Sequence, residues 1–159
     1  MAIEIERKFL VRGDAWRVQV RNVSRLRQAY ISDTSRALVR VRVKDGEGAH
    51  LTVKSYLGGI SRKEFEYTIP VEDAEDLLAL RYGAIVAKTR YDVPFGGLNW
   101  QIDVFEDDNE GLVLAEIELK SEDQPFSRPE WIGEDVTRFQ RYFSSELAKR
   151  PFRDWKLDR

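Results

Sequence analysis

Charged and apolar residues alternate along the first ten residues of the chain. Glu4, Glu6 and Lys8 occupy one set of alternate positions, and mainly apolar residues occupy the other. Side chains of a β-strand point alternately to the two faces of a sheet. The run 1–10 therefore predicts a strand with one charged and one apolar face.

The same period of two recurs along the chain and predicts eight strands in all. Gly-containing pairs such as Asp45-Gly46, Gly58-Gly59 and Gly96-Gly97 separate several of the segments and favour tight turns. Connections this short join antiparallel neighbours, because parallel strands need long crossovers. The further predicted strands are 26–31, 36–44, 49–56, 60–69, 85–93, 98–105 and 112–119.

Two segments have helical spacing instead. Residues 71–81 carry acids in the first turn and Gly83 just beyond the last, which predicts one crossing helix. Residues 136–149 carry apolar side chains at spacings of three and four and predict a second helix. We expect one domain over residues 1–159, with residues from about 150 to 159 as a frayed tail.

Composition narrows the function without defining it. The chain of 159 residues is 34% charged, against about 25% in a typical domain, yet its net charge is only −2. A general nucleic-acid surface is usually strongly basic, so no nucleic-acid partner is expected. The absence of cysteine excludes disulfides and favours a reducing compartment. With no leader sequence and no apolar run of about 18 residues, we expect a cytoplasmic protein without a membrane partner.

The charged positions on the face marked by Glu4 form two balanced sets. A solvated sheet face would explain any single pair of them. However, charges fill the middle of nearly every strand, and like charges placed opposite one another cost stability. A closed barrel with its apolar face outward would collect the charges in a lumen. We therefore predict an α+β fold, a closed eight-stranded antiparallel β-barrel with two helices. The basic set is Lys8, Arg40, Arg42, Lys54, Arg62, Lys88 and Arg90, and the acidic set is Glu4, Glu6, Glu64, Glu66, Asp103, Glu116 and Glu118.

Burial of this many charges without water would cost several kcal/mol per ion. Such a lumen therefore needs a ligand that carries both positive and negative charges. A polyphosphate with bound Mg²⁺ or Mn²⁺ satisfies this requirement. Arg forks match phosphate oxygens, and carboxylates without His or Cys suit hard cations. Glu4 with Glu6, and Glu116 with Glu118, each place two carboxylates about 6.6–6.8 Å apart along one face. The pattern is typical of metal-assisted phosphoryl transfer to water.

The segment Glu4-Ile5-Glu6-Arg7-Lys8 resembles the Glu-x-Glu-x-Lys signature of the CYTH superfamily, the triphosphate tunnel metalloenzymes. The resemblance continues through the later charged strands to about Leu147, and it is closest to the short prokaryotic members that are inorganic triphosphatases. It implies an eight-stranded tunnel and hydrolysis of a small anionic triphosphate. Inorganic tripolyphosphate, cleaved to pyrophosphate and phosphate, is the expected substrate.

The resemblance also implies a role for each charged position. Glu4, Glu6 and Glu118 would hold a substrate-bridging Mg²⁺ or Mn²⁺. Asp103 and Glu116, with Glu118 as a candidate shared ligand, would hold a second metal at the attacking water. The implied catalytic set is Asp103, Glu116, Glu118 and Lys8, and the implied phosphate-binding set is Lys8, Arg40, Arg42, Lys54, Arg62, Lys88 and Arg90.

Three implied positions remain less defined. Glu64 and Glu66 are expected to orient the basic residues rather than to bind metal, and Arg62 lies either in the lumen or at its mouth. The second helix would close one end of the barrel, with Arg138 or Arg141 reaching in. Alternatively, that helix only covers apolar barrel surface.

Two other functional classes stay open. One is a class IV-type adenylate cyclase, although those enzymes carry a His-Phe pair where this chain has Ala29-Tyr30. The other is a non-catalytic module that binds polyphosphate or nucleotides, for which the loss of one acidic pair would be the expected sign. The sequence leaves the oligomeric state undefined, with a homodimer among the candidates.

Overall fold

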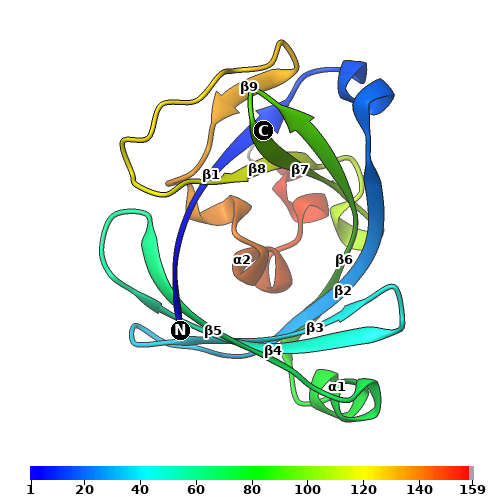
Figure 1. Cartoon of the computed structure of the whole chain (residues 1–159). Helices are drawn as coiled ribbons and strands as arrows, with labels where there is room; N and C mark the ends of the chain where they lie inside the picture. The colour runs from blue at the N-terminus through cyan, green and yellow to red at the C-terminus, as the bar shows by residue number, and fades with distance from the viewer. Residues whose placement is uncertain (158–159) are drawn as a thin grey trace.

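The strands form a single antiparallel sheet that closes on itself (Figure 1). The computed structural model describes residues 1–157. Within that range the strand order is β5-β4-β3-β2-β6-β7-β8-β1-β9, and an additional β5–β1 pairing completes the ring. The strands are β1 (Ala2–Val11), β2 (Asn22–Asp33), β3 (Leu38–Lys44), β4 (Gly48–Tyr56), β5 (Ser61–Thr68), β6 (Tyr82–Phe95), β7 (Leu98–Phe105), β8 (Val113–Glu118) and β9 (Ile132–Asp135).

Strand β1 closes the barrel by pairing along both of its edges. On one edge it runs beside β8, where Lys8 lies opposite Glu116. On the other edge its first half pairs with β5, where Glu4 lies opposite Arg62, and its end pairs with β9. The predicted closed eight-stranded barrel is confirmed, and the short strand β9 is an addition that the sequence pattern did not reveal.

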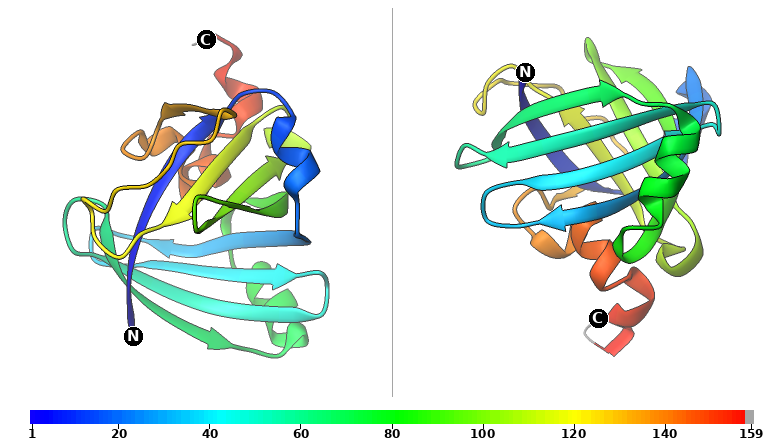
Figure 2. Two further views of the ribbon diagram at one scale, coloured as in Figure 1. Left: turned by 45° about the horizontal axis from the view of Figure 1, so that its top comes forward. Right: turned by 90° about the horizontal axis from the view of Figure 1, so that it is seen from below.

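The apolar faces of the strands point outward, and separate parts of the chain cover them. Helix α1 (Val71–Leu78) lies outside the barrel (Figures 1 and 2). Its residues Ala74 and Leu78 pack with apolar residues of β2, β3 and β4 such as Val41. The predicted crossing helix is thus present, ending at Leu78 rather than at Arg81.

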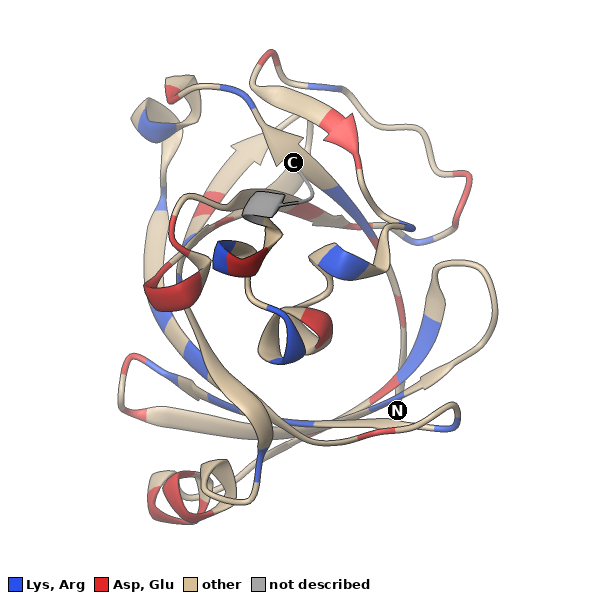
Figure 3. Ribbon diagram, turned by 180° about the vertical axis from the view of Figure 1, so that it is seen from behind, with Lys and Arg blue, Asp and Glu red and all other residues tan. Residues whose placement is uncertain are grey.

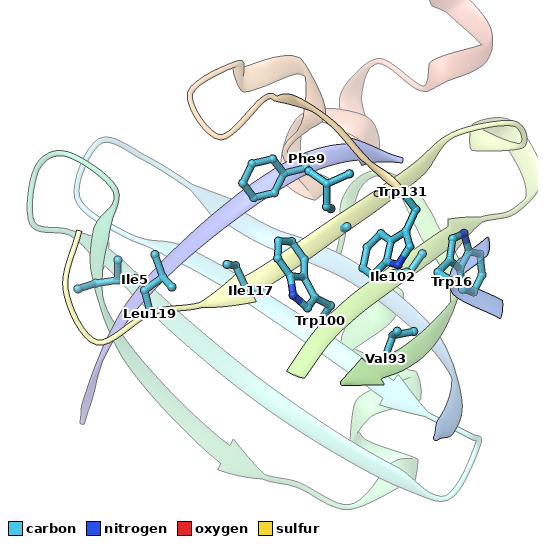
Figure 4. Packing of buried hydrophobic residues seen from close by; sticks show 11 residues of the cluster. Ile5, Phe9, Trp16, Val93, Trp100, Ile102, Ile117, Leu119 and Trp131 are labelled. Carbon is cyan, nitrogen blue, oxygen red and sulfur yellow. The ribbon is translucent and has the colours of Figure 1, made fainter. Parts of the chain in front are cut away.

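A second outer cluster is rich in tryptophan (Figure 4). Trp100 on β7 packs against Phe9 of β1, with ring centroids 5.6 Å apart, and edge-on against Trp131 at 5.5 Å. Trp16, from the 3₁₀ helix η1 (Ala15–Gln19), joins the same cluster. The aromatic residues therefore provide the packing that keeps the charged face turned inward.

The predicted helix 136–149 is wrong over its first half. Strand β9 ends at Asp135, the chain then runs through an irregular stretch into the 3₁₀ helix η3 (Gln140–Tyr142), and only α2 (Ser144–Lys149) is α-helical. The backbone N–H of Val136 donates to the carbonyl of Lys8, so this residue continues the pairing with β1. Phe139, expected on the apolar face of the helix, is 49% exposed. Spacings of three and four can therefore arise in a chain that packs irregularly.

The C-terminal segment fills one end of the lumen with apolar side chains. Leu147 of α2 and Trp155 of the 3₁₀ helix η4 (Phe152–Leu157) pack in one cluster with the lumen-facing residues Val86 and Leu114. This arrangement places α2 inside the ring of strands in Figure 1. The prediction that the second helix closes one end of the barrel agrees with this packing.

The expectation of a frayed tail is wrong for residues 151–157. Trp155 is 2% exposed, and its ring lies 5.1 Å from those of Tyr142 and Phe152. The backbone N–H of Phe152 donates to Oδ1 of Asn109, which belongs to the 3₁₀ helix η2 (Asp107–Asn109). Residues 158 and 159 of the predicted tail lie outside the described residues.

Charged residues lie around the barrel wall as well as on α1 and the outer loops (Figure 3). No helix within residues 1–157 is long and apolar enough to cross a membrane.

Replacing Trp155 by alanine should destabilise the protein by about 3–5 kcal/mol, because a fully packed aromatic side chain is removed. The measurement is the free energy of unfolding from urea titration. Phe139→Ala, which truncates a half-exposed ring, is the matched control and should change stability little. Equal stability of the Trp155→Ala variant and the unmodified chain would show that the C-terminal segment does not anchor the fold.

Candidate active site in the barrel lumen

The lumen holds a cavity of about 490 Å³. Such a volume lies within the usual range for small-molecule sites. All seven basic residues predicted from the sequence line this cavity, and so do six of the seven acidic ones, the exception being Asp103. Because alternate positions of every strand face the same way, closure of the sheet brings these side chains together. The sequence prediction of a charged lumen is therefore confirmed.

Three carboxylates, those of Glu4, Glu6 and Glu118, gather on one side of the cavity. Glu6 of β1 lies directly opposite Glu118 of β8. Burial, and then the charges of Glu116 and Glu4, raise the pKa of Glu6 to about 7. Burial raises the pKa of Glu4 as well, against the opposing charge of Lys54. Burial also raises the pKa of Glu118, and the charges of Glu4 and Glu6 add to the effect. This side of the lumen thus has an excess of negative charge, which a cation would relieve.

The chemistry of these donors fits a hard divalent cation, although the side chains are not yet arranged around one. Their ligand atoms are all carboxylate oxygens, which Mg²⁺, Mn²⁺ and Ca²⁺ prefer. In residues 1–157 no three acidic or histidine side chains form a group already close enough to hold a metal. Oε1 of Glu4 lies 2.8 Å from Nζ of Lys54. Lys54 would therefore have to share or release Glu4 when a cation binds.

Asp103 and Glu116 lie among cations. The carboxylate of Asp103 accepts from Nε and an Nη of Arg90 at 2.7 and 2.9 Å, and Nζ of Lys88 lies 2.7 Å away. Burial opposes ionisation of Asp103, but the charges of Arg90 and Lys88 outweigh it and hold its pKa below the usual value. Glu116 lies 3.5 Å from Lys8 and 3.4 Å from Arg90. Burial likewise opposes its ionisation, and Lys8 and Arg90 lower its pKa in spite of this.

This geometry bears on the metal role predicted for Asp103. The side chain is completely buried and does not reach the cavity surface. It fixes Arg90, whose guanidinium lines the cavity, and it stabilises the ammonium of Lys88, whose pKa burial lowers to about 8. The contacts of Asp103 are thus with the two cations Arg90 and Lys88. Its role as a metal ligand stays a prediction.

The two acids predicted to orient basic residues do contact them. Glu64 lies 3.5 Å from Lys54, and Glu66 lies 3.8 Å from Arg40. The buried hydroxyl of Thr52 links the second pair, because it accepts from Arg40 at 3.3 Å and donates to Glu66 at 3.0 Å. Nε of Arg40 is buried without a partner among the described residues. Arg40 is thus held in place with a hydrogen-bond donor unused.

The C-terminal segment contributes to the cavity wall. The ring of Phe143 lies 5.6 Å from Nζ of Lys8 and 5.3 Å from the guanidinium of Arg62, which also lies over Tyr56. Of the two arginines expected to reach in, Arg138 lines the cavity. Arg141 lies instead over the rings of Tyr142 and Trp155.

Sequence reasoning missed the neutral polar residues of the lumen. Gln28 and Tyr30 of β2 and Gln101 of β7 line the cavity together with Thr137 and Ser144. Their alternate positions within strands could have identified the first three. A search for charges alone passes over them.

The family model of the CYTH domain matches residues 2–150 of this chain. The chain belongs to the CYTH family. An inorganic triphosphatase of Acetivibrio thermocellus is 45% identical over 157 residues, which cover 98% of this chain and 99% of that protein. A second inorganic triphosphatase, from Nitrosomonas europaea, is 40% identical over 154 residues, covering 91% and 96% of the two chains. The crystal structure of an inorganic triphosphatase matches with a TM-score of 0.66 at 35% identity, covering 93% and 95%.

Membership of the CYTH family accounts for the tunnel fold and implies a divalent metal. That Glu4, Glu6 and Glu118 of this CYTH domain hold the metal stays a prediction. The Glu-x-Glu-x-Lys signature is the lumen-facing half of β1.

Asp103→Asn should destabilise this CYTH domain by about 3–5 kcal/mol at neutral pH, because Arg90 and Lys88 lose their buried counter-charge. A carboxylate whose pKa is lowered on folding contributes stability above its unfolded pKa, about 4, and loses it as pH falls through the folded value. The Asn variant should therefore lose less stability between pH 5 and 2 than the unmodified chain. Denaturant unfolding across that range, without metal, measures both effects.

Asp76→Asn, on the exposed face of α1, is the control for this substitution. If Asp103 served only as a metal ligand, the metal-free Asn variant would be as stable as the unmodified chain.

Proposed function

We propose that this chain is a divalent-metal-dependent hydrolase that cleaves a terminal phosphoanhydride bond of a small triphosphate. Inorganic tripolyphosphate, split into pyrophosphate and phosphate, is the favoured substrate. One observation carries the proposal: a lumenal cavity has cations along part of its wall and a group of carboxylates with raised pKa values along another part. A metal-bound polyanion is complementary to both parts.

The basic residues would bind and orient the phosphate chain. Arg40 and Arg90 have guanidinium groups held by Thr52 and Asp103, so little conformational freedom is lost when they donate to phosphate oxygens. Lys8 and Lys88 add positive charge where the leaving group becomes more negative. Enclosure by the barrel strengthens each of these interactions, since few solvent molecules screen them.

The reaction itself is a balanced hydrolysis. The oxygen of water forms a bond to the terminal phosphorus, the bond from that phosphorus to the bridging oxygen breaks, and the water releases its proton. Glu4, Glu6 and Glu118 would hold Mg²⁺ or Mn²⁺, which would supply charge neutralisation and Lewis acidity at this side of the lumen. The nearby carboxylates of the cavity are the groups placed to orient the attacking water and to accept its proton.

Hydrolysis is favoured over the two alternatives. The relatives at 40–45% identity are both inorganic triphosphatases. The Ala29-Tyr30 pair differs from the His-Phe pair of class IV-type cyclases, and the Tyr30 hydroxyl already accepts a hydrogen bond from Gln28. A binding module would not need both acidic pairs, yet Glu4, Glu6, Glu116 and Glu118 all line the cavity. The cytoplasmic location stays a prediction.

Glu118→Gln should lower kcat/KM by about 100-fold or more, because removing even a group that supports a metal ligand costs 10–100-fold. The assay measures phosphate, pyrophosphate and cyclic AMP released from tripolyphosphate, thiamine triphosphate and ATP, with Mg²⁺ and with Mn²⁺. Glu130→Gln, in an exposed loop, is the control and should keep full activity. Full activity of the Glu118→Gln variant would remove Glu118 from the site, and cyclic AMP as the main product would overturn the proposed reaction.

Arg40→Ala should raise KM for tripolyphosphate roughly 10–100-fold, since hydrogen bonds to charged groups contribute about 1.5–3 kcal/mol each. Arg36→Ala, at an exposed turn before β3, removes the same charge outside the lumen and should leave KM unchanged. Steady-state kinetics with saturating Mg²⁺ makes the comparison. An unchanged KM and kcat in Arg40→Ala would place this residue outside the substrate site.

A further inference from the structure

Gln28 is a fully buried neutral side chain in a lumen otherwise dominated by charges. It lies on β2 directly opposite Arg42 of β3. Its Oε1 accepts a hydrogen bond from Nε of Arg42 at 2.8 Å, and its Nε2 donates to the hydroxyl of Tyr30 at 2.9 Å. Both ends of the amide are thus engaged, which fixes the side chain and the guanidinium that it contacts.

Most other lumenal cations have a carboxylate partner. Lys8 pairs with Glu116, Arg40 with Glu66, Lys54 with Glu4, and Lys88 and Arg90 with Asp103. In the described part of the chain, by contrast, Arg42 forms no ion pair, and its side chain donates instead to the amide of Gln28. Arg62 also lacks an ion pair within residues 1–157, but it lies against the rings of Tyr56 and Phe143.

The environment of Arg42 makes its charge unusually costly in the absence of a ligand. Burial, and then the nearby charges of Arg40 and Arg90, lower the pKa of Arg42 to about 9. A carboxylate at position 28 would relieve this cost, because glutamate has nearly the same size as glutamine. The chain places a neutral acceptor there instead, so the guanidinium is oriented without being neutralised.

We propose that Gln28 is a positioning residue that fixes Arg42 through a neutral hydrogen bond and thereby reserves the charge of Arg42 for a phosphate group of the substrate. This inference rests on the proposed function, since it assumes an anionic phosphate ligand in the lumen. It predicts that a negative charge at position 28 has two opposite effects. The charge stabilises the protein without ligand, and it weakens the binding of the substrate.

The test compares Gln28→Glu with Gln28→Met. Glu keeps a hydrogen-bond acceptor for Arg42 and adds a negative charge, whereas Met removes both hydrogen bonds without adding charge. Tripolyphosphate binding is measured by calorimetry without metal, KM and kcat are measured with Mg²⁺, and thermal unfolding is measured without ligand. Gln19→Glu, on the exposed surface of η1, adds the same charge outside the lumen and should behave as the unmodified chain.

We expect Gln28→Glu to raise Kd and KM roughly tenfold to a hundredfold, in keeping with one opposing charge a few ångströms away at an intermediate dielectric constant. Its effect on kcat should be smaller, and its melting temperature should equal or exceed that of the unmodified chain. Gln28→Met should bind tripolyphosphate better than Gln28→Glu but melt at a lower temperature. If Gln28→Glu does not fold, Arg42→Gln tests the same charge and must raise Kd to a similar extent.

The outcomes separate the two proposals. A purely structural role for Gln28 predicts the opposite order, with Met binding more weakly than Glu, and that result would overturn the inference. So would wild-type affinity in Gln28→Glu or Arg42→Gln, while hydrolysis by the unmodified chain left the proposed function intact. If the unmodified chain neither bound nor hydrolysed any triphosphate, the proposed function would fail and this inference with it.

Discussion

Charge compensation inside a closed lumen is the constraint on which the rest of this structure depends. Closing a sheet that alternates charged and apolar positions encloses one of its two faces, and here the enclosed face carries the charges. Enclosure is tolerable only because cations and anions meet across the strands, as Lys8 does with Glu116 and Arg90 does with Asp103. The outer apolar clusters and the C-terminal segment can be understood as the parts that hold this arrangement together.

Charge compensation is incomplete in two places in the lumen, one acidic and one basic. Glu6 and Glu118 face each other with raised pKa values, while Arg42 lies beside further arginines with a neutral partner. Without a ligand, therefore, the carboxylates repel one another on one side of the lumen and the arginines repel one another on the other. A guest with matching charges of both signs would remove both costs together, so the metal and the polyanion would each favour binding of the other.

The sequence predicted what depends on alternation and missed what depends on packing. The positions of Glu4, Glu6 and Lys8 on one face of β1 follow from a period of two, and they lie where that period places them. The helix expected over 136–149 failed because Val136 pairs with β1, a contact set by tertiary structure rather than by local spacing. The burial of Asp103 behind Arg90 depends on how deep each position lies in the barrel, which a linear pattern does not encode.

Strand β1 has a consequence for how the protein is made. It pairs with β5 early in the sequence, but also with β8 and β9, so that Lys8 meets Glu116 and Phe9 meets Asp135, more than a hundred residues later. Because the chain is synthesised from its N-terminal side, β1 is made well before β8 and β9 and cannot pair with them until they exist. Contacts between residues so far apart in the sequence slow folding. A chain truncated before β8 would be unable to close the barrel and bring its acidic and basic residues together. The barrel and its chemistry should accordingly emerge in one late, cooperative step.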